Sequence, residues 1–385
     1  MRHVALIYDA KLPYDLKVIS GVALYMQRST EFVTFTEEDA LKNQRLPALR
    51  SWRGDGIIAD FDDPNVATAV LRSKLPTVGF GGGFGWYPQN AGIPYFFSDQ
   101  RKIGEMAADH LMERGFQNFG YCDFARSATN VWGVERGGSF AARLAQHGFS
   151  CSLFHPPYKT VRNWTSVLAS IGNWLQSLPK PVGVMGANDR RAYHVLEACR
   201  EHKIRVPEEV AVIGVDNDEM LCQLSNPALS SIEQGAKQIG YQAAALLDRM
   251  MRGARPRRRH YVIAPIAIVT RRSTDVLAIE DPLILEAMAF IRSNSQHGIN
   301  VTDVVKAVGV SRSTLESRFK ASVGETIHAV IRRIQLDRAR RLISETNLAM
   351  KEIAAHTGFK SIQHMTSLFG KAFGQTPGRY RKHLI

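Results

Sequence analysis

The chain has 385 residues, of which 45% are hydrophobic and 22% are charged, and its formal net charge is +13. This length exceeds one domain, and the composition is that of a globular protein rather than a disordered or collagen-like one. The basic charge indicates a polyanionic partner, either nucleic acid or an anionic membrane surface. No run of about twenty apolar residues is free of charge, and the N-terminal MRHVALIYDAKLPYD is too short and polar for a signal peptide, so we expect a cytoplasmic protein without membrane contact.

Four cysteines occupy positions 122, 151, 199 and 222. They form no CxxC pair and have no histidine partner at zinc-finger spacing, so we interpret them as small buried hydrophobic residues in a reducing compartment. The phosphate-binding motif GxxxxGK[ST] and the nucleophile motif GxSxG are absent from the sequence. We therefore expect no metal, no cofactor and no catalytic residue.

Short apolar runs that end in Gly, Asp or Asn alternate with helical patterns over about the first 270 residues. Such alternation is typical of βαβ units and predicts an α/β fold with a mostly parallel sheet. The expected strands are His3–Tyr8, Gly56–Asp60, Thr77–Phe80, Asn118–Cys122, Gly183–Gly186 and Ala211–Val215. The helical patterns between them span Leu16–Met26, Ile103–Glu113, Gly137–His147, Trp164–Gln176 and Ala192–His202.

Polar and aromatic side chains gather where these strands end, which is where open parallel sheets bind ligands. Carboxylates, amides and guanidinium groups hold vicinal hydroxyls, and aromatic rings pack on a C–H face, so the set fits a sugar or polyol. We predict sugar binding by Asp9, Tyr14, Asp60, Phe80, Trp132, Arg136, Asn188, Asp189, Asp216 and Gln234. A structural alternative stays open for single members: Asp60 could cap a helix, and Asp9 or Asp216 could close a turn.

We interpret two further features of this region, a glycine-rich segment and a basic cluster, as loops. The segment Gly79–Gly85 is rich in glycine and follows a strand, but it lacks the full dinucleotide-binding spacing, so we favour a ligand-lining loop. The basic cluster of Arg252, Arg255, Arg257, Arg258 and Arg259 precedes the last expected strand, and we interpret it as a solvated loop rather than a DNA contact.

The pattern changes near residue 274, after which every predicted element is a helix. We expect an α/β domain over 1–274, a linker over 275–282 and an all-helical domain over 283–385. Within the last, residues 301–324 and 350–374 repeat one pattern: a short helix ends at Gly309 or Gly358, a capping Ser311 or Ser361 follows, and a second helix begins. This pattern predicts two helix-turn-helix units.

The second helix of such a unit lies in the major groove of DNA, with its N-terminal residues at the base edges. We predict DNA binding by Arg312, Ser313, Thr314, Glu316 and Ser317 in the first unit and by Lys360, Ser361, Gln363, His364 and Ser367 in the second. Ile362 occupies a base-reading position where a polar residue is more usual, so the second unit is the weaker reader. The basic segment between the units, residues 331–342, predicts a helix that bridges both cores. Its arginines either form a solvated face or, for some of them, add phosphate contacts.

The order and spacing of these helical motifs resemble the AraC/XylS family of regulators over about residues 283–383. The resemblance includes the closing GQTPGRYR at 374–381. It implies two DNA-reading units joined by one long helix.

Residues 3–273 resemble the sensor core of LacI/GalR regulators, which is itself similar to two-lobed periplasmic sugar-binding proteins. The motifs that carry the resemblance are MGAND at 185–189, VAVIGVDN at 210–217, SSIEQGAKQIGYQAA at 230–244 and IVTRRST at 268–274. The resemblance implies a type I periplasmic-binding-protein fold and sugar contacts by Arg136, Asp216 and Gln234. The DNA-binding helices that usually precede such a core are missing, and an equivalent follows it instead.

A LacI-type sensor joined to an AraC-type reader resembles the family of xylose operon regulators, with matching segments that include GDGIIADFDD at 54–63 and VGETIHAVI at 323–331. The resemblance implies D-xylose as effector, activation of xylose catabolic and uptake genes, operator DNA and RNA polymerase as partners, and a homodimer in the nucleoid. Another pentose or hexose stays open as effector.

We expect the sugar to bridge the lobes, with Arg136 on one side and Asp216 with Asn188 or Asp189 on the other, so that binding favours closure. Two alternatives remain from the residues alone. A sugar kinase or isomerase would need a catalytic base with a metal or nucleotide site, and a transport protein would need export.

Overall fold

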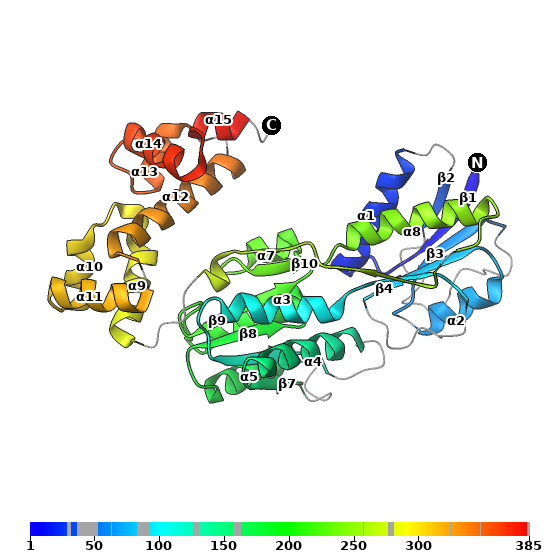
Figure 1. Ribbon diagram of the computed structural model, residues 1–385, viewed down its shortest axis with the longest axis horizontal. Helices are drawn as coiled ribbons and strands as arrows, with labels where there is room; N and C mark the ends of the chain where they lie inside the picture. Colours follow the sequence, from blue (N-terminus) through cyan, green and yellow to red (C-terminus); the bar gives the residue numbers. More distant parts are fainter. Residues whose placement is uncertain are drawn as a thin grey trace. The chain divides into compact units, whose positions relative to one another are not determined.

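The computed structural model describes residues 1–28, 32–36, 53–62, 64–82, 92–125, 131–156, 163–256, 258–275, 281–323, 325–346 and 348–382. The chain divides into two compact units, Met1–Val276 and Leu277–Ile385 (Figure 1). Most of the expected linker, Arg257 and the end of the glycine-rich segment lie outside the described residues.

The first unit contains two sheets, each the centre of one lobe. Lobe 1 has six parallel strands in the order β11-β5-β4-β3-β1-β2. Helices α1 (Pro13–Met26) and α8 (Ala236–Met251) cover one face, and α2 (Pro64–Ser73) covers the other. Side chains of a strand alternate between faces, so Val4 and Leu6 join the α1/α8 core while Ala5 and Ile7 join the α2 core. The strands are β1 (Arg2–Ile7), β2 (Phe32–Thr36), β3 (Gly56–Asp60), β4 (Thr77–Gly81), β5 (Tyr95–Ser98) and β11 (His260–Ile263).

Lobe 2 has the strand order β12-β10-β9-β8-β6-β7, in which only β12 is antiparallel to its neighbour. Helices α5 and α6 pack on one face, and α3 packs along α4. The strands are β6 (Asn118–Cys122), β7 (Cys151–Phe154), β8 (Val182–Gly186), β9 (Val210–Val215), β10 (Ser230–Glu233) and β12 (Ala267–Val269). The helices are α3 (Gln100–Met112), α4 (Val131–Gln146), α5 (Trp164–Ser177), α6 (Asp189–Glu201) and α7 (Glu219–Leu224), and a short 3-10 turn follows at Arg272–Thr274.

The chain passes between the lobes three times, from β5 to α3, from β10 to α8 and from β11 to β12. Each lobe is therefore built from separate parts of the sequence. These three crossings place the carboxyl ends of β1, β3 and β4 opposite those of β6, β8 and β9, which is the arrangement that the resemblance to two-lobed binding proteins implies.

The predicted α/β fold is confirmed, and all six predicted strands are present within one or two residues. The last strand expected after the basic cluster is present as two strands, β11 and β12. The sequence analysis missed β2, β5, β7 and β10, and the helices α2, α7 and α8. These missed strands have five residues or fewer, and β2 and β7 lie at sheet edges, where partial exposure weakens the apolar pattern. The four cysteines are free thiols, and all but Cys151 are buried.

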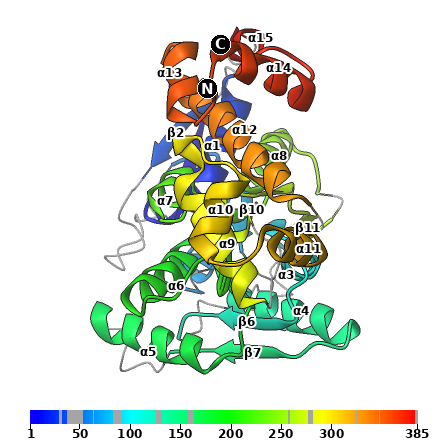
Figure 2. The same ribbon diagram turned by 90° about the vertical axis from the view of Figure 1, so that its left-hand side faces the viewer.

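The second unit is entirely helical in its described residues. Its elements are α9 (Pro282–Asn294), a 3-10 turn (Ser295–His297), α10 (Val301–Val308), α11 (Arg312–Val323), α12 (Ile327–Glu345), α13 (Met350–His356), α14 (Ile362–Phe373) and α15 (Pro377–Lys382). Two apolar cores form, and α12 runs between them (Figure 2). Ile331 lies in the first core, and Leu336 and Ala339 lie in the second, so α12 bridges them as its sequence predicted.

No helix in the described parts of the chain has the length and apolar character needed to cross a bilayer. The described residues also bring together no group of three or more histidine, cysteine or acidic side chains suited to a metal ion.

The packing of α1 on α8 gives a test of the lobe 1 core. The two helices touch backbone to backbone, and a Cβ on Gly240 would overlap the carbonyl oxygen of Val18. We expect Gly240→Ala to lower the free energy of unfolding by about 2 kcal/mol or more, because the helices must separate. The matched control is Gly138→Ala on α4, where a Cβ meets no atom within 4 Å and alanine should stabilise by about 0.5 to 1 kcal/mol.

Urea unfolding followed by tryptophan fluorescence measures both variants, because all five tryptophans precede residue 175 and report on the first unit. Equal midpoints for Gly240→Ala and wild type would show that the two helices do not pack this closely.

Candidate functional site

A cleft of about 1230 Å³ lies between the lobes at the carboxyl ends of their strands. Lobe 1 contributes the ends of β1 and β3 and the start of α1, and lobe 2 contributes the ends of β8, β9 and β10. Its lining combines many acidic and other polar side chains with apolar ones such as Leu16, Met220 and Ile266, and lobe 2 adds two aromatic rings. The lining includes Asp9, Lys17, Asp60, Asp62, Phe124, Trp132, Asn188, Asp189, Asp216, Asn217, Glu233 and Lys237.

Six of the ten residues proposed from sequence for sugar binding line this cleft: Asp9, Asp60, Trp132, Asn188, Asp189 and Asp216. The other four lie outside its described lining. Tyr14 is buried below the cleft, where its hydroxyl donates to the Gly81 carbonyl oxygen at 2.7 Å. Phe80 is fully buried in the lobe 1 core, since its strand is covered on both faces. Arg136 and Gln234 lie behind Asp216.

The sequence-based expectation that Arg136 and Asp216 face each other from opposite lobes is wrong. Arg136 is on α4, which follows β6, and Asp216 follows β9, so both belong to lobe 2. Asn188 and Asp189 follow β8 in the same sheet. A ligand that bridges the lobes must therefore reach across to lobe 1.

Arg136 has one percent of its surface exposed, and its side chain is the largest fully buried one among the residues that the structure describes. Its Nε donates to Gln100 Oε1 at 2.8 Å, its Nη2 donates to Gln234 Oε1 at 3.2 Å, and its Nη1 donates to the Ala187 carbonyl oxygen. The Trp132 ring lies 4.9 Å from the guanidinium carbon, within cation–π distance. Gln100 and Gln234 belong to two of the three crossings, so Arg136 fixes both of them.

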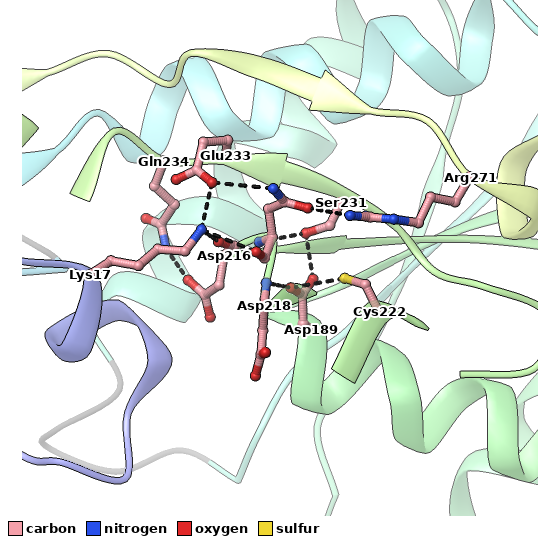
Figure 3. A network of polar contacts seen from close by, with 10 residues as sticks. Lys17, Asp189, Asp216, Asp218, Cys222, Ser231, Glu233, Gln234 and Arg271 are labelled. Atoms are coloured by element: carbon pink, nitrogen blue, oxygen red, sulfur yellow. Dashed lines mark hydrogen bonds and ion pairs between the residues drawn. The ribbon is translucent and has the colours of Figure 1, made fainter. Parts of the chain in front are cut away.

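Gln234 connects Arg136 to Asp216, because its side-chain amide nitrogen donates to Asp216 Oδ1. Burial raises the pKa of the Asp216 carboxyl to about 6, and the Arg136 guanidinium opposes this shift. Burial and the neighbouring Asp216 also raise the pKa of Asp189 well above its usual value. Asp189 accepts hydrogen bonds from Ser231 Oγ at 2.5 Å and from the Asp218 amide at 2.7 Å, so it supports the turn after β9 (Figure 3).

Some lining residues were missed by the sequence analysis. Asp62 accepts a hydrogen bond from the Gly82 amide at 2.8 Å, and its position two residues after Asp60 was the available signal. Asn217 follows Asp216 in the VIGVDN motif, and its amide donates to Ser231 Oγ. Lys17 carried no signal, because it lies inside the helical pattern Leu16–Met26.

The second unit contains the two predicted helix-turn-helix arrangements, α10 with α11 and α13 with α14. Gly309 and Gly358 adopt positive φ angles of 73° and 76° where the first helices end. Ser311 and Ser361 cap the second helices, since their hydroxyls accept from the amides of Thr314 at 3.2 Å and His364 at 3.1 Å.

All ten residues proposed for DNA contact are exposed on α11, on α14 or just before it. The apolar positions Leu315, Phe319, Met365 and Phe369 face the cores. Arg312 forms an ion pair with Glu316 at 2.9 Å, which DNA would have to rearrange. Ile362 is partly buried against the second core, which gives it a packing role.

A two-lobed α/β unit with a ligand-sized cleft, followed by two helix-turn-helix arrangements, defines a ligand-sensing transcription regulator. Models of three families match the chain: an XylR N-terminal domain over residues 3–101, a periplasmic binding protein-like domain over 108–274 and a helix-turn-helix domain over 304–383.

Full-length relatives share this arrangement. The xylose operon regulatory protein of Escherichia coli is 38% identical over 382 residues, covering 99% of this chain and 97% of the relative. Its counterpart in Haemophilus influenzae is 36% identical and covers 98% of this chain and 97% of the relative. A solved structure of a xylose-binding transcription activator, XylR, is 37% identical with a TM-score of 0.82 and covers 99% of this chain and 98% of that one. The chain belongs to the family of xylose operon regulatory proteins, which are DNA-binding transcription regulators and not enzymes.

The buried Asp216 carboxyl makes the free energy of unfolding depend on pH. An unfolded aspartate has a pKa near 4, so the folded chain binds more protons than the unfolded chain between about pH 4 and pH 6. Its free energy of unfolding therefore falls as pH rises through this window, and the loss persists above it. Asp216→Asn lacks this titration, so the stability of the variant minus that of the wild type should increase by about 2 kcal/mol from pH 4.5 to pH 7.5.

Urea unfolding at both pH values, followed by tryptophan fluorescence, measures this difference. If the two proteins lose or gain stability in parallel across the window, Asp216 is not the group responsible.

Proposed function

We propose that the protein is a D-xylose-dependent activator of xylose catabolic and uptake genes. The single observation that carries the proposal is the inter-lobe cleft, in which carboxylates from both lobes, the Asn188 amide and the Trp132 ring lie around one space. Carboxylate and amide groups suit vicinal hydroxyls, and an aromatic ring suits the C–H face of a sugar. The printed names of the full-length relatives favour xylose over other pentoses or hexoses.

Sugar would bridge the lobes through Asp9 and Asp60 of lobe 1 and through Asn188 and Asp216 of lobe 2. Arg136 and Gln234 would position Asp216 and not contact the sugar, because their polar atoms already bind Asp216 and the crossing segments. Sugar hydroxyls would complete contacts that only the closed arrangement offers, so binding shifts the population toward closure.

The effector would control DNA binding by the second unit. We propose residues 1–274 as the sensor, 275–282 as the linker and 283–385 as the DNA-binding domain. The five polar residues at the start of α11 provide the better base reader, since Ile362 at the start of α14 is used for packing. A homodimer would present two copies of this domain to operator DNA and RNA polymerase in the cytoplasm, on the nucleoid.

A gel-shift titration on the DNA upstream of the xylose genes tests the proposal. We expect D-xylose to tighten binding by about tenfold, which lies within the usual range for allosteric coupling. Binding should also weaken steeply with salt, because each phosphate contact releases a counterion. L-arabinose and D-ribose serve as comparison sugars.

Unchanged affinity with D-xylose would remove it as effector, and a response to another pentose alone would replace it. The DNA-reading surface has its own control in the same titration. Arg312→Ala should weaken binding by about tenfold or more, while Arg200→Ala, which removes an exposed arginine from lobe 2, should leave it unchanged.

A further inference from the structure

Lys17 lies on α1 in lobe 1, but every acceptor that its ammonium group contacts in the described part of the chain belongs to lobe 2. Nζ donates to the carbonyl oxygens of Asp216 at 2.6 Å and Asn217 at 3.1 Å, and to Glu233 Oε2 at 2.5 Å (Figure 3). An ammonium group has three N–H donors, and these three acceptors occupy all of them. Lys17 therefore has no donor left for a ligand, although its side chain lines the cleft.

The acceptors belong to the part of lobe 2 that must be held in place for sugar binding. Asp216 and Asn217 have positive φ angles of 113° and 49°, which are unfavourable for residues with a Cβ and persist only where neighbours stabilise them. Glu233 is the last residue of β10, immediately before the crossing to α8. The Asn217 side chain connects these acceptors, since it donates to Glu233 Oε2 at 3.3 Å and accepts from Arg271 Nη2 at 2.8 Å.

The helix that carries Lys17 is itself fixed within lobe 1. α1 contacts α8 through the close approach at Gly21 and Gly240, so its position cannot adjust independently of that lobe. The lysine and glutamate side chains are 27% and 21% exposed, so solvent only partly screens their ion pair. Hydrogen bonds from a charged donor to such acceptors are stronger than those between neutral groups.

We propose that Lys17 is an inter-lobe clasp that holds the lobes together and positions the Asp216–Asn217 turn before any effector arrives. Lys17 is thus a positioning residue and not a sugar ligand. For an effector that binds only the closed arrangement, the apparent dissociation constant equals the intrinsic dissociation constant divided by the closed fraction. Because the clasp increases the closed fraction, it raises affinity without contacting the ligand. The affinity part of this inference depends on the proposed xylose function, whereas the clasp itself does not.

The test compares Lys17→Met with Lys237→Met in the full-length chain. Lys237 lies on α8, lines the same cleft and has no polar partner among the described residues, so its substitution removes the same charge without breaking a contact. Hydrogen exchange without sugar reports on the clasp. We expect faster exchange over residues 216–222 in Lys17→Met, because the turn then loses the ammonium group that holds its two carbonyl oxygens, and the backbone amide bonds of Asn217 and Asp218 open more often. We expect no change in Lys237→Met.

Calorimetric titration with D-xylose reports on affinity. We expect Lys17→Met to weaken binding by about tenfold and Lys237→Met to leave it unchanged. Glu233→Gln provides a second, milder variant, because it leaves the two carbonyl acceptors in place. Glu233→Gln should also weaken D-xylose binding. It should have little further effect in a chain that already carries Lys17→Met, because substitutions of two interacting residues are not additive.

Three results would overturn the clasp. The first is equal exchange in wild type and Lys17→Met, and the second is an equal effect of Lys237→Met. The third is complete loss of sugar binding by Lys17→Met with unchanged exchange, which would make Lys17 a direct ligand. If wild type bound no D-xylose while the exchange difference persisted, the clasp would stand and the proposed effector would fail.

Discussion

The cleft depends on the burial of one charge, the guanidinium group of Arg136. An arginine cannot escape burial by losing its proton, and an unpaired buried charge costs several kcal/mol. The fold meets this constraint with acceptors from three separate segments, Gln100, Ala187 and Gln234, and with the face of Trp132. Two of those segments are crossings between the lobes. The hydrogen bonds that the buried Arg136 guanidinium requires thereby hold two of the segments through which the chain leaves lobe 2.

The consequences of that constraint reach the cleft surface through Gln234 and Asp216. Asp216 is held by Gln234 on its side chain and by Lys17 on its backbone, while Asp189 supports the turn that follows. The carboxyl groups of Asp216 and Asp189 thus accept hydrogen bonds from neutral donors within lobe 2. The cleft therefore favours a ligand whose hydroxyl groups donate to these carboxylates. A neutral polyol is such a ligand.

The sequence predicted those features that follow from where a strand or helix ends. Asp60, Asn188 and Asp216 end buried strands, so the parallel-sheet rule placed them in the cleft. Gly309 and Ser311 mark a helix end and a helix start, and their backbone geometry follows from their side chains. Features that depend on long-range packing could not be read this way. Phe80 lies on a strand covered on both faces, so alternation did not reveal that its ring enters the core.

Assignment to a lobe was also beyond the sequence. The three crossings interleave the two lobes, and nothing local in α4 shows that Arg136 belongs with Asp216. Lys17 and Glu233 are 216 positions apart, and each is ordinary in its own helix or strand. The tandem helix-turn-helix units, in contrast, are made of local contacts and were predictable in detail.

We propose that the cleft, which buried Arg136 organises, binds D-xylose. Calorimetric titration of D-xylose into the wild type and Arg136→Lys tests it most directly, with Arg143→Lys on the same helix as a control. A lysine keeps the charge but cannot reach the three acceptors in a planar fork, so we predict a loss of affinity of at least tenfold for Arg136→Lys and none for Arg143→Lys. Wild-type affinity in Arg136→Lys would show that the buried guanidinium does not organise the sugar site.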